Sequence, residues 1–248
     1  MIIRKSKDEI ATMRRAGRIV AQTLKLIENE IKPGVETLSL DSIAERSIRK
    51  SGARPAFKGY RGFPASICAS INETVVHGIP SHRRLKEGDI ISIDIGAEIN
   101  GYYADAAATY PVGSISEEAV HLIDLTKSAL EEGIAKCVED NYLYDISHAI
   151  QVKAESAGYS VVREFVGHGI GREMHEDPQI PNFGLPRRGP KIKVGMVFAI
   201  EPMVNMGDYK VDILPDGWTV VTADRRLSAH FEHTVAVTED GPAVLTVL

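Results

Sequence analysis

The sequence predicts an α/β sandwich whose two halves are related by a pseudo-twofold axis. Each half contains two segments with the spacing of amphipathic helices, followed by apolar segments typical of strands. Each half also contains a His-Gly pair followed by a similar heptapeptide, GDIISID at 88–94 and GMVFAIE at 195–201. Both heptapeptides end in an acidic residue. This repeated order indicates an internally duplicated fold with helices packed on a sheet.

The first helix of each half is predicted from its cap and its apolar spacing. Segment 7–31 begins after Ser6, with Glu9 completing a capping box, and segment 117–139 begins after Ser116. Apolar side chains recur along one predicted face of each helix, at Ile10, Met13, Val20, Leu24 and Ile27 in the first and at Val120, Ile123, Leu130 and Ile134 in the second.

A second helix follows in each half, near 39–51 and 144–157. The helices stop at Gly52 and Gly158, because glycine adopts the left-handed conformation after a helix at little cost. We predict one domain spanning 1–248, made of pseudo-symmetric halves of about 1–112 and 113–248.

A β-hairpin is predicted where Asn100-Gly101 follows an apolar strand, because this dipeptide favours a two-residue type I′ turn. If Ile99 pairs with Tyr102, the register of the whole hairpin follows from the strict alternation of side chains.

Two aspartates, Asp94 and Asp105, then become diagonal neighbours on one face of the hairpin, about 7–8 Å apart at the backbone. Ser92 and Gly96 leave room on that face, and the opposite face is rich in isoleucine. Two adjacent carboxylates repel each other unless they are protonated or bridged by a cation. Either this face is exposed to solvent or the pair binds a metal ion, and the apolar flanks make the metal site at least an equal alternative.

The second half supplies further candidate ligands. Glu201 takes the place of Asp94 in the repeated heptapeptide, Glu232 begins the apolar segment EHTVAV, and His168 lies between glycines in VGHGIGREMHEDP. No one of these residues is diagnostic alone, since most strand glutamates and most histidines are structural. Their joint occurrence at corresponding places is the informative observation.

Composition excludes several classes of protein. The 248 residues are 44% hydrophobic and 25% charged, with a net charge of −5, which is typical of a globular domain and argues against specific nucleic-acid binding. No segment has the length and hydropathy of a membrane span or a signal peptide. Two cysteines are too few for a disulfide framework. We therefore expect a cytoplasmic protein without membrane contact.

Taken together, an apolar strand with Asp-x10-Asp, then GHGIGREMHEDP, AIEP and a terminal FEHT resemble the type I methionine aminopeptidases over essentially the whole chain. The resemblance implies the pita-bread fold, a curved, antiparallel-rich sheet covered by helices. It implies a hydrolase that removes the N-terminal methionine of nascent polypeptides with a small second residue. Only 25 residues separate His175 from Glu201 and 30 separate Glu201 from Glu232, which leaves no room for the helical insertion of type II enzymes. We therefore expect the short bacterial-style form.

The resemblance also implies two divalent metal ions per chain, drawn from Co, Mn, Fe, Zn and Ni. Asp105 and Glu232 would bridge both ions, Asp94 would chelate one, and His168 with Glu201 would complete the other. An oxygen-rich set with one imidazole suits such metals. A metal pair lowers the pKa of a bound water and polarises a carbonyl group.

Catalytic and substrate-binding roles follow from the same resemblance. His175 would polarise the carbonyl oxygen, and His77 would hydrogen-bond the peptide beyond the cleaved bond. Glu201 would shuttle a proton from the water to the leaving amine. The implied methionine pocket is apolar and is formed by Tyr60, Phe63, Cys68 and Trp218.

Several neighbouring features receive weaker assignments. Phe57 is interpreted as core packing, and Met174 stands where some members of the family carry an aromatic residue. Asn72, Thr74 and Ser228 resemble a monovalent-cation site of some members. A nascent-chain substrate suggests contact with the ribosome, but we interpret the basic segment 186–193 as a surface loop without a partner. The family suggests a monomer.

Two alternatives stay open. X-Pro aminopeptidases and prolidases share the fold and the metal pair, but they usually carry a large N-terminal domain that we do not expect here. A non-catalytic binding module on the pita-bread fold would typically have lost metal ligands, and all five candidate ligands are present.

Overall fold

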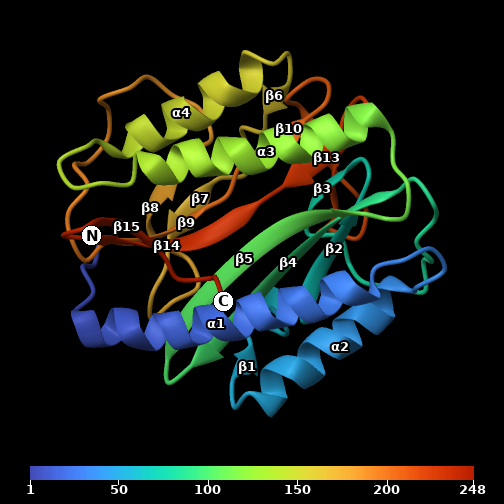
Figure 1. The fold of residues 1–248 in the computed structure, drawn as a ribbon, viewed down its shortest axis with the longest axis horizontal. Helices are drawn as coiled ribbons and strands as arrows, with labels where there is room; N and C mark the ends of the chain where they lie inside the picture. The colour runs from blue at the N-terminus through green and yellow to red at the C-terminus, as the bar shows by residue number, and fades with distance from the viewer.

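Four α-helices pack around a central antiparallel sheet in the computed structural model, which describes residues 1–248. Helices α1 (Lys7–Glu30) and α2 (Thr37–Lys50) lie together on one side of the strands, and α3 (Glu117–Ala135) and α4 (Leu143–Glu155) lie together on the other (Figure 1). The predicted α/β architecture, an antiparallel-rich sheet covered by helices, is confirmed.

Three of the helices follow the sequence signals closely. The Ser6 hydroxyl accepts a hydrogen bond from the Glu9 backbone N–H, and the Glu9 carboxylate accepts one from the Ser6 backbone N–H, so α1 begins with the predicted capping box. The bounds of α2 and α4 lie within two residues of the predicted ones. Gly52 and Gly158, just after these two helices, have positive φ angles of 77° and 84°.

Helix α3 differs from the prediction in its length and in its buried face. It ends at Ala135 rather than 139, because the chain turns there to bury Cys137 in the core. Val120, expected on the buried face, is 44% exposed. The reason is the close approach of α4: a side chain at Gly133 would collide with Ile150, so the face with small residues packs against α4. That buried face consists of Ala119, Leu122, Leu125, Thr126, Ala129, Leu130 and Gly133.

The central sheet contains nine strands in the order β1-β4-β5-β14-β9-β7-β8, with β2 paired to β4 and β15 paired to β14. All of these pairings are antiparallel. The strands are β1 (Arg54–Pro55), β2 (Ile67–Ile71), β4 (Ile90–Ile99), β5 (Tyr102–Pro111), β7 (Gly167–Gly169), β8 (Glu176–Ile180), β9 (Val197–Ile200), β14 (Glu232–Thr238) and β15 (Gly241–Val244).

Two small sheets complete the fold. One has the order β13-β10-β6 and the other β11-β12-β3. No helix lies between His175 and Glu232, as the short spacing predicts. The strands of the small sheets are β3 (Thr74–Val76), β6 (Ser160–Val161), β10 (Met203–Asn205), β11 (Val211–Ile213), β12 (Val220–Thr222) and β13 (Ser228–His230).

Two hydrophobic cores lie on the helix-covered parts of the sheet. The isoleucines of β4, such as Ile93, pack against α1 and α2, whereas Phe198 of β9 and Val235 of β14 pack with the side chains of α3 and α4. The division into two pseudo-symmetric halves near residue 112 stays a prediction. No helix of the structure combines the length and the apolar character that a membrane crossing requires.

Candidate metal centre and substrate pocket

The β4–β5 hairpin has the predicted register along its whole length. Asn100 and Gly101 adopt positive φ angles of 54° and 78°, as a type I′ turn requires. Asp105 lies opposite Gly96, so Asp94 and Asp105 are diagonal neighbours on one face. Gly96 has no space for a side chain, because a Cβ there would meet the Phe57 ring at 2.9 Å. The hairpin therefore presents both aspartates without obstruction.

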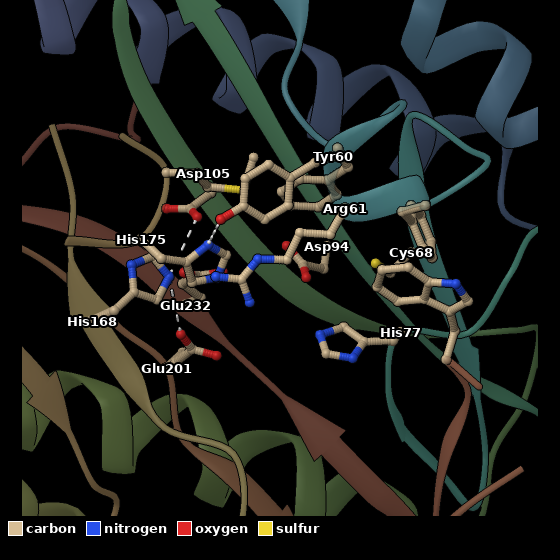
Figure 2. A pocket seen from close by; sticks show the side chains of 14 residues that line it. Tyr60, Arg61, Cys68, His77, Asp94, Asp105, His168, His175, Glu201 and Glu232 are labelled. Atoms are coloured by element: carbon tan, nitrogen blue, oxygen red, sulfur yellow. Dashed lines mark hydrogen bonds and ion pairs between the residues drawn. The ribbon is translucent and has the colours of Figure 1, made fainter. Parts of the chain in front are cut away.

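Three further side chains converge on these aspartates from the second half of the chain (Figure 2). Glu232 begins β14 and pairs with β5, His168 lies in the middle of β7, and Glu201 directly follows β9. Because β14 joins β5 to β9, and β9 pairs with β7, one continuous sheet presents all the candidate ligands. Ligand atoms of Asp105, His168 and Glu232 lie within 4.8 Å of one another.

The imidazole of His168 is oriented as a metal ligand would be. Its Nδ1 lies 2.9 Å from the Gly169 carbonyl oxygen, which can only accept, so Nδ1 carries the proton. Burial lowers the pKa of His168 to about 4, so the ring is neutral at pH 7. The unprotonated Nε2 then faces Glu201 Oε1 at 3.5 Å and Asp105 Oδ2 at 3.8 Å. A lone pair directed at carboxylate oxygens is repulsive unless a carboxyl group is protonated or a cation lies between them.

The four carboxylates of the cluster have no lysine or arginine partner in the structure. Burial raises the pKa of Asp105 to about 6. Burial and then the neighbouring negative charges raise the pKa of Asp94, Glu201 and Glu232 well above the usual range. In addition, Asp94 Oδ1 is buried without a hydrogen-bond partner. Protein groups alone do not compensate this concentration of charge.

The donor set fits divalent metal ions. Four carboxylates carry a formal charge of about −4, which two divalent cations would balance, and one neutral imidazole adds a nitrogen ligand. The structure thus brings together all five residues that the sequence predicts as ligands.

His175 lies at the solvent-exposed rim of this cluster. Its ring stacks on Tyr60 with centroids 5.3 Å apart and lies 4.2 Å from the ring of His168. The Tyr60 hydroxyl is 2.8 Å from Nδ1 of His175. Partial loss of water around the stacked ring lowers the pKa of His175 to about 4, so the imidazole is neutral at pH 7.

His77 lies on the other side of the cavity (Figure 2). It adopts a positive φ of 59°, and burial lowers its pKa. Its ring meets Phe165 and Trp218 edge-on, with centroids 5.5 Å and 6.3 Å away. The next residue, Gly78, has no space for a side chain, because a Cβ there would collide with the Ala69 carbonyl group of β2. Close strand packing therefore explains the His-Gly pair.

The four residues predicted for the methionine pocket line the same cavity as the candidate ligands: Tyr60, Phe63, Cys68 and Trp218. Phe57, interpreted as core packing, is 8% exposed and also contributes to the cavity wall. The sequence argument missed Arg61, whose exposed side chain lines the cavity.

A second residue missed from sequence is His230. It is fully buried, and its Nε2 lies 3.8 Å from Glu201 Oε2 without a hydrogen-bond partner. The alternation of side chains in an extended segment places His230 on the same side as Glu232, and this is the signal that could have identified it.

The proposed monovalent-cation residues are partly brought together. The Ser228 backbone N–H donates to the Asn72 carbonyl oxygen at 2.9 Å, and Thr74 begins β3 nearby in the chain. A cation at this position stays a prediction.

Comparison with known proteins is consistent along the whole chain. The model of metallopeptidase family M24 matches residues 11–239. A methionine aminopeptidase of Clostridium perfringens is 57% identical over 248 residues, which is 100% of both chains. The crystal structure of a methionine aminopeptidase from Thermotoga maritima superimposes with a TM-score of 0.99 at 45% identity, and the match covers 100% of each chain.

A prolidase from Pyrococcus furiosus shares the fold, with a TM-score of 0.82 at 24% identity. This match covers 99% of the present chain but 66% of the prolidase. The chain therefore belongs to metallopeptidase family M24, in which it groups with the methionine aminopeptidases.

Proposed function

We propose that this protein is a metal-dependent aminopeptidase that removes the N-terminal methionine from polypeptides with a small second residue. The observation that carries the proposal is that one cavity combines five candidate metal ligands with an apolar, aromatic pocket. Full-length similarity to methionine aminopeptidases supports it.

Asp94, Asp105, His168, Glu201 and Glu232 would hold two divalent ions, with Asp105 and Glu232 shared between them. These two residues lie on the adjacent strands β5 and β14, which favours a shared role. When bound, the ions would supply an activated water and polarise the scissile carbonyl group.

Glu201 is the candidate proton carrier. Its carboxylate lies at the edge of the cluster, between the ring of His168 at 3.5 Å and that of His230 at 3.8 Å. Both rings are buried, and burial lowers the pKa of each, so neither competes for the proton at pH 7. Glu201 would accept the proton of the attacking water and release it to the leaving amine.

His175 is the candidate hydrogen-bond donor to the substrate carbonyl oxygen. If the Tyr60 hydroxyl donates to Nδ1, the neutral ring carries its proton on Nε2 and can donate it toward the cavity. A neutral donor of this kind stabilises the negative charge that develops on the oxygen. His77, on the opposite wall, would bind the peptide beyond the cleaved bond.

The pocket would bind the methionine side chain. Phe63 and Trp218 meet edge-to-face with centroids 5.1 Å apart, and Cys68 is buried beside them. A flexible thioether makes favourable contacts with aromatic edges, which suits this wall.

The test is turnover by the protein after chelation and reloading with each divalent metal. We expect rapid release of methionine from Met-Gly-Met-Met and little cleavage of Gly-Pro dipeptides. Faster cleavage of the dipeptide would support the X-Pro peptidase alternative. Absence of metal uptake in equilibrium dialysis, together with an unchanged Asp105→Ala variant, would support the non-catalytic module.

The cellular setting is part of the proposal. A monomer in the cytoplasm, acting on nascent chains, is what the family suggests. For segment 186–193 we keep the surface-loop interpretation, because Lys193 is paired with Asp140 at 2.7 Å and its charge is partly neutralised.

A further inference from the structure

We infer that the buried ion pair between Lys5 and Glu176 positions His175 for the reaction, so that a residue preceding α1 acts as a positioning residue of the active site. The inference deepens the proposed function and rests on the role proposed there for His175.

The ion pair is short and is shielded from water. Lys5 Nζ lies 2.5 Å from Glu176 Oε2, and the two side chains are only 3% and 7% exposed. Lys5 Nζ also donates to the Ile3 carbonyl oxygen at 3.2 Å. Most other ion pairs of the chain lie on its surface, where such pairs contribute little. A buried pair instead specifies one geometry, because either charge left alone is costly.

The second carboxylate oxygen of Glu176 organises the loop that carries His175. Glu176 Oε1 accepts hydrogen bonds from the backbone N–H groups of Arg172, at 2.7 Å, and Glu173, at 3.3 Å. At the start of the loop, a Cβ on Gly171 would meet both Glu176 and the Lys5 side chain. The Lys5 side chain and the Glu176 carboxylate thus fill the inside of loop 171–176.

The segment before α1 is itself anchored. The Lys5 backbone N–H donates to the Gly195 carbonyl oxygen at 2.6 Å, and Arg4 Nε donates to the Val194 carbonyl oxygen at 2.6 Å. Residues 194 and 195 lead into β9, and Glu201 directly follows that strand. Lys5 therefore connects the loop of His175 to the strand that presents a candidate metal ligand.

A second contact holds the same loop from outside. The Arg172 guanidinium lies 4.7 Å from the centre of the Tyr102 ring and 3.4 Å from the Glu9 carboxylate. The Tyr102 hydroxyl donates to that carboxylate at 2.5 Å. The Arg172 side chain is exposed and flanks the loop, whereas the Lys5–Glu176 pair lies inside it.

His175 depends on this support because its own ring is lightly held. The side chain is exposed at the rim and has one hydrogen bond, to Tyr60, besides its stacking contacts. Its backbone position is set by Glu176, the next residue. A displacement of about 1 Å at a catalytic group can cost about 100-fold in rate.

The experiment compares Lys5→Met, Glu176→Gln and the double variant with the parent, using the metal-loaded protein and a Met-Ala peptide. We expect kcat to fall by about 10- to 100-fold with KM changed by less than about twofold. Metal binding measured by calorimetry should stay close to that of the parent, because none of the five candidate ligands lies in the pair. The double variant should be no worse than the poorer single variant. Lys5→Arg should recover much of the activity.

Ile27→Ala is the matched control. Ile27 of α1 is buried, like the Lys5–Glu176 pair, but it packs in the hydrophobic core between α1, α2 and the sheet. It should lower the melting temperature and leave kcat of the folded protein unchanged. If Lys5→Met behaves like Ile27→Ala, the pair is only structural and the inference is overturned.

A second measurement separates this inference from the proposed function. In the chelated protein, nitrogen-15 spectra of the histidine rings should show the His175 signals displaced in Lys5→Met but not in Ile27→Ala. Unchanged His175 signals would overturn the positioning role even if the parent is active. A parent that releases no methionine would overturn the proposed function, while the spectra would still decide the positioning.

Discussion

Replacing Asp105 by asparagine should stabilise the metal-free protein while weakening its binding of divalent metals. The carboxylate is 3% exposed, and burial raises its pKa from 3.8 to about 6. At about 1.4 kcal/mol for each pKa unit, ionised Asp105 costs the folded protein about 3 kcal/mol at pH 8. Asparagine keeps the shape and the acceptor oxygen to which Thr234 Oγ1 donates at 3.2 Å.

The pH dependence of this gain follows from the sign of the shift. A folded-state pKa raised above the unfolded value gives stability that is complete below about 3.8 and is lost as the pH rises through about 6. Asp105→Asn removes that loss, so its advantage should be about 3 kcal/mol at pH 8 and about half of that at pH 5. For a chain of this size, 3 kcal/mol corresponds to a rise in melting temperature of roughly 6–12 °C.

The assay is thermal unfolding in excess chelator at pH 5 and pH 8, followed by titration with Mn²⁺. Asp124→Asn, on the exposed surface of α3, is the matched control and should leave the melting temperature unchanged. Metal should raise the melting temperature of the parent more than that of Asp105→Asn. If the chelated Asp105→Asn variant has the same melting temperature as the chelated parent at pH 8, Asp105 carries no unfavourable charge. The conclusion that this cluster needs a cation would then be wrong.

Three further predictions concern the same cavity. Glu201→Gln should raise the melting temperature of the chelated protein at pH 8, because burial and then the neighbouring carboxylates raise the pKa of Glu201 well above its usual range; an unchanged melting temperature in thermal unfolding would contradict this. His77→Ala and His175→Ala should bind metal normally in calorimetry but lose about 10²–10⁴-fold in kcat, and parental turnover by either variant would remove its assigned role. Trp218→Ala should lower kcat/KM for methionyl peptides by about 10- to 200-fold in steady-state assays, whereas an unchanged value would show that the indole does not form the pocket.

Much of the site could be predicted because its local geometry depends on neighbouring residues. Asn100-Gly101 defines a turn, the turn defines the register of β4 and β5, and the alternation of side chains then places Asp94 beside Asp105. The same holds for the start of α1, where Ser6 and Glu9 cap each other. Each of these rules acts over a few residues and does not depend on the rest of the fold.

Other features depend on elements that are distant in the chain. The buried face of α3 was predicted only in part: Leu130 is buried and Ile123 and Ile134 pack against the core, but Val120 is exposed, because the approach of α4 at Gly133 decides which side faces inward. Phe57 was assigned only to the core, since its position on the cavity wall depends on the space above Gly96. The position of His230 beside Glu201 likewise depends on the packing of separate strands.

The sequence by itself determined which side chains can serve as ligands, where the helices begin and which face of the hairpin is acidic. Only the tertiary structure decided that β14 joins β5 to β9, so that carboxylates from both halves meet around His168. Only the tertiary structure placed Lys5 against Glu176, 171 positions later in the chain. Local patterns follow from backbone geometry and capping, whereas these meetings depend on how helices and strands pack after the chain has folded.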